Sequence, residues 1–167
     1  EQREKSLAAS DTGRRAEELK AILEEKRREK TKTEEELRSL ISPLTKALGR
    51  ITKQSSSERI RLEHGEAFLN LMNSPAQVSS AEIAGSLREL RSHLAALGLK
   101  DRKKEKVLDH IDQLISKRSL ELARSRHFAL AEEIESLEGQ HRESSKEALH
   151  LRESISQDKR ALRSLEG

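Results

Sequence analysis

The sequence has no cysteine, tryptophan or tyrosine, and its 167 residues include only two phenylalanines, Phe68 and Phe128. Without cysteine, neither a disulfide framework nor a thiolate metal site can form. A compact domain of this length normally fills its core with aromatic side chains. The shortage of aromatics therefore argues against a single thick globule and favours thin seams between helices.

The sequence also lacks long apolar runs. No stretch approaches the roughly 18 apolar residues of a membrane-spanning helix, and no signal peptide is visible. We therefore expect no membrane partner and a cytoplasmic location. The chain opens with "EQREK", without an initiator Met, and stops at "SLEG" inside a periodic run, so we expect it to be part of a longer protein.

Charged residues make up 38% of the chain, in near balance, with 33 basic and 30 acidic side chains. Abundant Ala, Glu, Lys, Leu and Arg with few aromatics is typical of long helices and coiled coils. The apolar residues recur at heptad spacing in two long segments. The first series is Ala16, Leu19, Leu23, Lys26, Lys30, Thr33, Leu37, Leu40, Leu44, Ala47 and Ile51. The second is Leu120, Ala123, His127, Leu130, Ile134, Leu137, His141, Ser144, Ala148, Leu151, Ile155, Asp158, Leu162 and Leu165.

A short third helix is expected between these segments. Pro75 marks the end of the first long helix, and "SSAE" offers Ser79 as N-cap with Glu82 three residues later. Gly98 is a suitable stop for the short helix. We expect its apolar face to pack on both long helices, through the contacts of Ile83, Leu87 and Leu90 with Leu69, Met72, Leu108 and Ile111.

The lengths of the segments predict the architecture. Residues 15–72 and 107–164 would each form a helix about 87 Å long, too long for the inside of a small domain. The sequence thus predicts an all-α fold, a long antiparallel intramolecular coiled-coil hairpin with a small helical tip. Pairing between two open chains is the alternative. The predicted parts are an N-terminal extension (1–14), a first arm (15–72), a tip (73–106) and a second arm (107–167).

A joint is a further hypothesis. A symmetric hairpin would place Pro43 opposite Leu137 to Gly139, so that both arms are weakened at one level, because Pro removes a helical hydrogen bond and Gly is a poor helix former. The alternative is that Ser42 starts a new helix with Pro43 in its first turn.

Motifs for catalysis or metal binding are weak. The pairs Glu138/His141 and Glu147/His150 have a spacing used in metal sites of helical bundles. Their histidines fall on opposite faces of one helix, because about nine residues make about two and a half turns, so they cannot share an ion. The sequence contains neither a GxxxxGK[ST] nor a GxGxxG loop. We expect a non-catalytic segment without metal, cofactor or small-molecule substrate.

A basic run is the strongest functional signal. Lysines at a helix N-terminus oppose the helix dipole and reduce local stability. The hairpin would bring this run to the tip and could thereby form a surface for DNA or an acidic protein partner. Simple solubility is the alternative. The residues concerned are Lys100, Arg102, Lys103, Lys104 and Lys106, with Arg88 and Arg91 of the short helix.

Two periodic arms, 15–72 and 107–165, joined by a short connector resemble an arm of the structural-maintenance-of-chromosomes (SMC) ATPases. The resemblance implies a spacer in a larger chromosome-associated protein, with ATPase heads elsewhere. A self-associating coiled-coil scaffold, binding a second copy, and an RNA-binding helical hairpin, similar to that of seryl-tRNA synthetase, are the alternatives.

Overall fold

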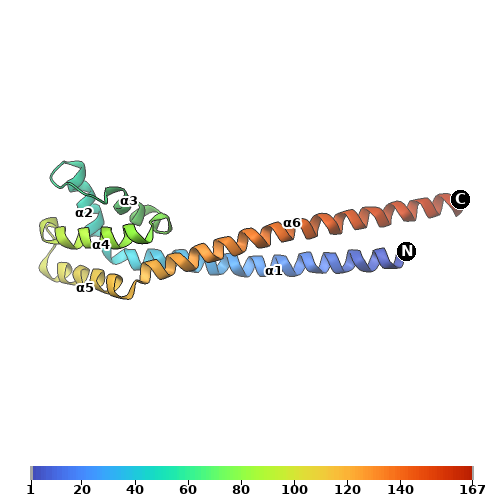
Figure 1. Ribbon diagram of the computed structural model, residues 1–167, viewed down its shortest axis with the longest axis horizontal. Helices are drawn as coiled ribbons and strands as arrows, with labels where there is room; N and C mark the ends of the chain where they lie inside the picture. Colours follow the sequence, from blue (N-terminus) through green and yellow to red (C-terminus); the bar gives the residue numbers. More distant parts are fainter. Residues whose placement is uncertain (1, 167) are drawn as a thin grey trace. The chain divides into compact units, whose positions relative to one another are not determined.

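The computed structural model describes residues 2–166 and shows an all-α protein (Figure 1). No strand occurs in this part of the chain. None of its helices is long and apolar enough to cross a membrane. In chain order the elements are α1 (Gln2–Ile41), the 3-10 helix η1 (Ser42–Leu44), α2 (Thr45–Ser56), α3 (Gly65–Asn73), η2 (Pro75–Gln77), α4 (Ser80–His93), η3 (Leu94–Leu97), α5 (Asp101–Lys117) and α6 (Ser119–Glu166).

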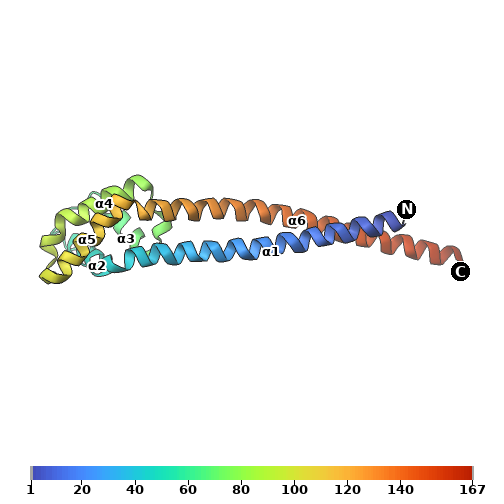
Figure 2. The ribbon, with the colours of Figure 1, turned by 90° about the horizontal axis from the view of Figure 1, so that it is seen from below.

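The chain forms two compact units. Unit 1 combines the chain up to Glu29 with the chain from Leu130 onward, and unit 2 is Lys30–Ala129. Within unit 1, α1 and α6 lie side by side (Figures 1 and 2). They run in opposite directions there, because a Cβ on Gly13 would lie 3.2 Å from Nη2 of Arg152 while Lys26 pairs with Glu133.

The predicted seams account for the packing of unit 1. Leu19 and Leu23 of α1 are buried, as are Ile134 and Ala148 of α6. Two ion pairs flank these apolar positions: Lys26 Nζ lies 3.0 Å from Glu133 Oε2, and Arg27 Nη2 lies 3.1 Å from Glu138 Oε1. Lys26 is a polar seam residue, and its hydrogen bond to Glu133 raises the pKa of its ammonium group.

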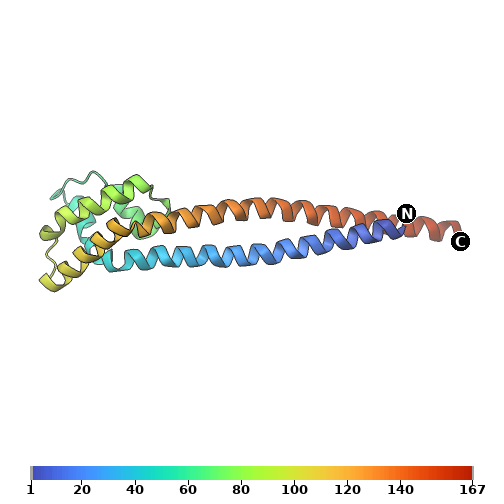
Figure 3. The same ribbon diagram turned by 60° about the horizontal axis from the view of Figure 1, so that its bottom comes forward.

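Unit 2 has a closed core built almost entirely from aliphatic side chains. Phe68 is fully buried in a cluster of leucines and isoleucines that come from α1 to α6, η1 and η3. The short helices that surround this core are seen in Figure 3. Several short helices can enclose a core without large aromatics, because each one contributes a single apolar stripe. The fully buried leucines and isoleucines are Leu37, Leu44, Leu48, Ile51, Leu71, Ile83, Leu87, Leu90, Ile111, Leu114 and Leu120.

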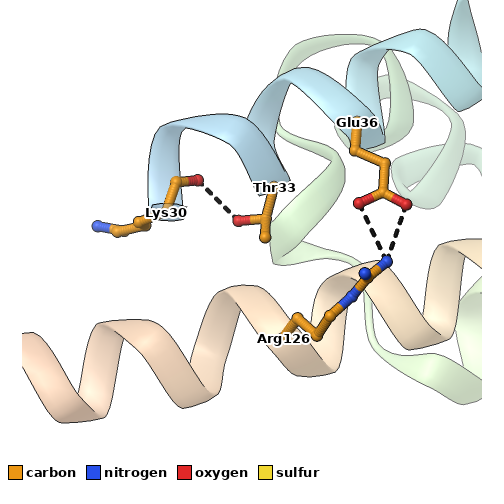
Figure 4. A network of polar contacts seen from close by, with 4 residues as sticks. All are labelled: Lys30, Thr33, Glu36 and Arg126. Atoms are coloured by element: carbon orange, nitrogen blue, oxygen red, sulfur yellow. Dashed lines mark hydrogen bonds and ion pairs between the residues drawn. The ribbon is translucent and has the colours of Figure 1, made fainter. Parts of the chain in front are cut away.

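Polar side chains interrupt the α1–α6 seam within unit 2 at Thr33 and His127. Thr33 is only 7% exposed and donates from Oγ1 to Lys30 O on its own helix. His127 of α6 is also buried, with Nδ1 at 3.5 Å from Thr33 Oγ1. Beside them, Arg126 Nη2 donates to both carboxylate oxygens of Glu36, at 2.8 and 3.0 Å (Figure 4).

The prediction of one helix over 15–72 is wrong. Helix α1 ends at Ile41, where Pro43 lies in a 3-10 turn, and α2 ends at Ser56. Residues 57–64 form no helix, and Glu58 adopts a positive φ of 59°. A carboxylate of α4 stabilises this break, because Glu89 accepts hydrogen bonds from the backbone N–H groups of Glu63 and His64.

The other predicted boundaries also differ from those of the structure. The second arm is not continuous, because Arg118 has a left-handed φ of 51° and separates α5 from α6. Helix α1 already includes residues 2–14, the range of the predicted extension. Unit 2 is much larger than the predicted tip of 73–106, because the short helices on both sides of that range share its core.

The two residues of the predicted joint belong to different units, Pro43 to unit 2 and Gly139 to unit 1. Gly139 lies inside the uninterrupted α6, next to Glu138, which pairs with Arg27. Pro43 borders a hollow with Lys103 and Val107 of α5. The symmetric register behind the joint required a first arm that continues to residue 72, whereas α1 ends at Ile41.

Local signals around the third helix are confirmed. Ser79 Oγ accepts from the backbone N–H of Glu82 at the start of α4, and Gly98 follows η3 with a left-handed φ of 66°. Helix α3 ends at Asn73, two residues before Pro75. Leu69 is the exception, since its side chain is 45% exposed instead of packing on α4.

Two glycines of unit 2 differ in the room around them. An ideal Cβ on Gly49 in α2 would meet nothing within 4 Å, whereas one on Gly85 in α4 would lie 2.6 Å from His64 Nε2. We predict that Gly49→Ala stabilises the protein by about 0.5–1 kcal/mol. Gly85→Ala loses this gain, because displacing a packed ring costs about 1–3 kcal/mol. Urea unfolding measures both, and equal stabilisation would contradict the His64 contact.

His127 predicts a pH dependence of stability. Burial lowers its pKa below 6.5, the nearby Glu34 carboxylate opposes this shift and Lys30 adds to it. Below pH 6.5 the unfolded chain therefore binds more protons at this site, so the free energy of unfolding falls as pH drops from 6.5 toward the folded-state pKa. Thermal unfolding of His127→Leu should show a weaker loss of stability on acidification than wild type.

His150→Gln is the matched control, because His150 is an exposed histidine on the same helix. A wild-type pH profile that His127→Leu leaves unchanged would contradict the role of the buried imidazole.

Candidate anion-binding surface

The basic run predicted at residues 100–106 forms the start of α5. Lys100 is the N-cap residue, with no side-chain capping bond, and its carbonyl accepts from Lys104 N at 2.8 Å. Lys100, Lys103 and Lys106 are exposed, as is Arg102. The first turn of a helix carries partial positive charge, so these lysines increase a positive potential that the backbone already produces.

Hydrogen bonds from two other elements position α5. Arg50 of α2 donates from Nη1 to Leu97 O at 3.0 Å and to Gly98 O at 2.7 Å, immediately before Lys100. His110 of α5 bonds through Nε2 to Leu40 O at the end of α1, at 2.6 Å. Together with the buried Val107 and Ile111, these bonds fix α5 against η1 and hold the residues just before α5 against α2.

This placement brings lysines from two elements together. Lys46 of α2 lies so near the start of α5 that its pKa is lowered, first by the charge of Lys103 and then by those of Arg50 and Lys100. We call Lys46, Arg50, Lys100, Lys103 and Lys106 the basic cluster. Among residues 2–166, no carboxylate lies within 4 Å of any of its lysines.

Other predicted tip residues do not join the basic cluster. Arg91 pairs with Asp112 of α5, its Nε lying 2.8 Å from Oδ1, so its charge is offset. Arg88, Arg102 and Lys104 have no ion pair in the described part of the chain. Sequence reasoning missed Lys46 and Arg50, although their spacing of four residues on one helix could have indicated a shared face.

A hollow lies within the basic cluster. Its lining comes from η1 and the start of α2 on one side and from α5 on the other. The lining residues are Ser42, Pro43, Thr45, Lys46, Lys103, Lys106 and Val107. Three lysines and two hydroxyl-bearing residues therefore border one hollow on the surface, whose lining also includes the apolar Pro43 and Val107.

The described residues contain no cluster of metal-ligating side chains. Nowhere in residues 2–166 do three or more His, Asp or Glu side chains lie where they could hold one ion. Neither a protein-family model, nor a curated protein, nor a solved structure matches the chain. The basic cluster is therefore the site on which we base a functional proposal.

The repulsion at Lys46 predicts a gain of stability on its removal. The lowered pKa means that protonated Lys46 opposes folding, so Lys46→Gln should raise the melting temperature at low ionic strength. The gain should shrink in high salt, because screening weakens interactions between exposed charges. Wild-type stability should also rise relative to Lys46→Gln as pH increases toward 10.5.

Lys53→Gln is the matched control, because Lys53 is an exposed lysine on the same helix outside the basic cluster. Equal effects of the two substitutions would show that Lys46 experiences no special repulsion.

Proposed function

We propose that the chain is a non-catalytic helical arm that acts as a spacer and binds double-stranded nucleic acid, with DNA as the expected form, through its basic cluster. The observation that carries the proposal is the convergence of unpaired lysines from α2 and α5. Such an arrangement costs stability in the free protein, and an incoming polyanion would remove that cost.

The long helices support a role as spacer. Helix α1 has 40 residues and α6 has 48, lengths of about 60 and 72 Å. We propose that they form an intramolecular antiparallel coiled-coil hairpin. The heptad seams and the ion pairs of Lys26 and Arg27 within unit 1 support this pairing. By analogy with the resemblance noted above, the hairpin would serve a larger intracellular, SMC-like protein.

The scarcity of aromatic side chains favours a duplex over single strands. Single-strand binding surfaces stack bases on aromatic rings next to a basic groove. Phe68 is fully buried. The ring of Phe128 is covered by the guanidinium of Arg124, whose Cζ lies 4.6 Å from the ring centroid. Phe128 therefore does not belong to the basic cluster. The basic cluster therefore offers charge without stacking platforms, which suits the regular phosphate backbone of a duplex.

A self-associating scaffold is the second candidate. The α6 seam continues into Leu162 and Leu165, which are 47% and 84% exposed. A second copy could cover these side chains. Sedimentation separates the two functions, since the arm predicts an elongated monomer and the scaffold predicts a dimer whose fraction rises with concentration.

Charge reversal tests duplex binding. Combined substitution of Lys100, Lys103, Lys104 and Lys106 by Glu should reduce affinity for a DNA duplex by at least about 100-fold at low salt. The slope of log K against log salt should also become shallower, by about 1 for each phosphate that the variant no longer neutralises. Fluorescence anisotropy of a labelled duplex measures both quantities.

A control variant changes the net charge equally at exposed sites outside the basic cluster, with Lys20, Lys32, Lys117 and Lys159 each replaced by Glu. It should retain most of the affinity. Equal weakening in the two variants would reduce the interaction to net charge alone, and no duplex binding by wild type would refute the proposal.

A further inference from the structure

The hollow within the basic cluster is bordered by residue types that bind oxyanions. Three lysines are among its lining residues, Lys46, Lys103 and Lys106, and so are two residues with hydroxyl groups, Ser42 and Thr45. Pro43 and the buried Val107 supply apolar surface. The donors come from both sides of the contact between η1, α2 and α5, so one small ligand could bridge the two sides.

The described part of the chain places no carboxylate within 4 Å of Lys46, Lys103 or Lys106. The hydrogen bonds of Arg50 to Leu97 and Gly98 fix one side of the contact, and that of His110 to Leu40 fixes the other. Lys46 and Lys103 consequently remain close despite their like charges. A ligand meets a positive site that is already assembled, which reduces the cost of ordering on binding.

The number of donors favours a tetrahedral dianion. A phosphate monoester carries close to two negative charges at pH 7 and presents three terminal oxygens as acceptors. An internal phosphodiester carries one charge and two terminal oxygens, and a carboxylate is also limited to one charge and two oxygens. The monoester therefore matches three neighbouring lysines best, because it brings a second negative charge and a third terminal oxygen.

We propose that this hollow binds a phosphate monoester, such as the 5′-phosphate at the end of a nucleic acid duplex. Free phosphate presents the same chemistry as a 5′-phosphate. The choice of a duplex end as the ligand therefore rests on the proposed function. The protein would then contact a duplex end through the hollow and the adjoining backbone through the remaining cations of α5.

The test compares two blunt duplexes of one sequence, with 5′-phosphate or 5′-hydroxyl ends, at equal ionic strength. Anisotropy titration of the wild-type chain should give about tenfold tighter binding to the phosphorylated duplex, since hydrogen bonds between charged groups are the stronger class. The double variant Lys46→Met/Lys103→Met should bind both duplexes equally. Arg102→Met/Lys104→Met, which removes two cations outside the hollow, should weaken both and keep the tenfold ratio.

A parallel arm measures the melting temperature of each protein in sodium phosphate against sodium chloride of equal ionic strength. If wild type binds neither duplex but is stabilised by phosphate, and Lys46→Met/Lys103→Met is not, the site stands with free phosphate as its ligand and the duplex function fails. If wild type binds both duplexes equally and phosphate has no specific effect, duplex binding stands and the monoester site is overturned. A preference that disappears equally in both double variants also overturns it, because general electrostatics would then explain the ratio.

Discussion

Two hydrogen bonds from the guanidinium of Arg50, to the carbonyl oxygens of Leu97 and Gly98, determine where α5 begins relative to α2. Gly98 makes this approach possible, because its left-handed φ of 66° turns the chain directly after η3. Behind these bonds, Ile51 and Leu97 are both buried in the aliphatic core. The position of the lysines is thus a result of how the core closes.

The same arrangement explains why repulsion persists in the folded state. An exposed lysine can normally rotate away from a like charge, but Lys46 and Lys103 stand on helices that both pack on η1 and η3 and are held near each other by that packing. The unfavourable interaction is small compared with the burial of many aliphatic side chains. A fold can therefore retain a cluster of cations at modest cost, which is the usual condition of a binding surface.

The heptad pattern predicted which side chains are buried more successfully than it predicted which side chains pack against them. Leu37, Leu44 and Ile51 follow one heptad series and are all buried, although the helix breaks between them at Pro43. A heptad pattern identifies an apolar face without stating what covers it. Local capping signals such as Ser79 and Gly98 were correct, because their hydrogen bonds or backbone angles involve only near neighbours. The break at residues 57–64 was missed, since a distant carboxylate stabilises it. Lys46 was missed for the same reason, as its approach to Lys103 depends on tertiary packing.

The way α3 begins has a consequence for the order of folding. Helix α4 has a capping residue of its own in Ser79, so its first turn can form from local sequence alone. Ahead of α3, the backbone N–H groups of Glu63 and His64 instead find their acceptor on Glu89, in the middle of α4. Helix α3 therefore completes the hydrogen bonds at its start only once α4 has docked, whereas the cap of α4 does not depend on α3.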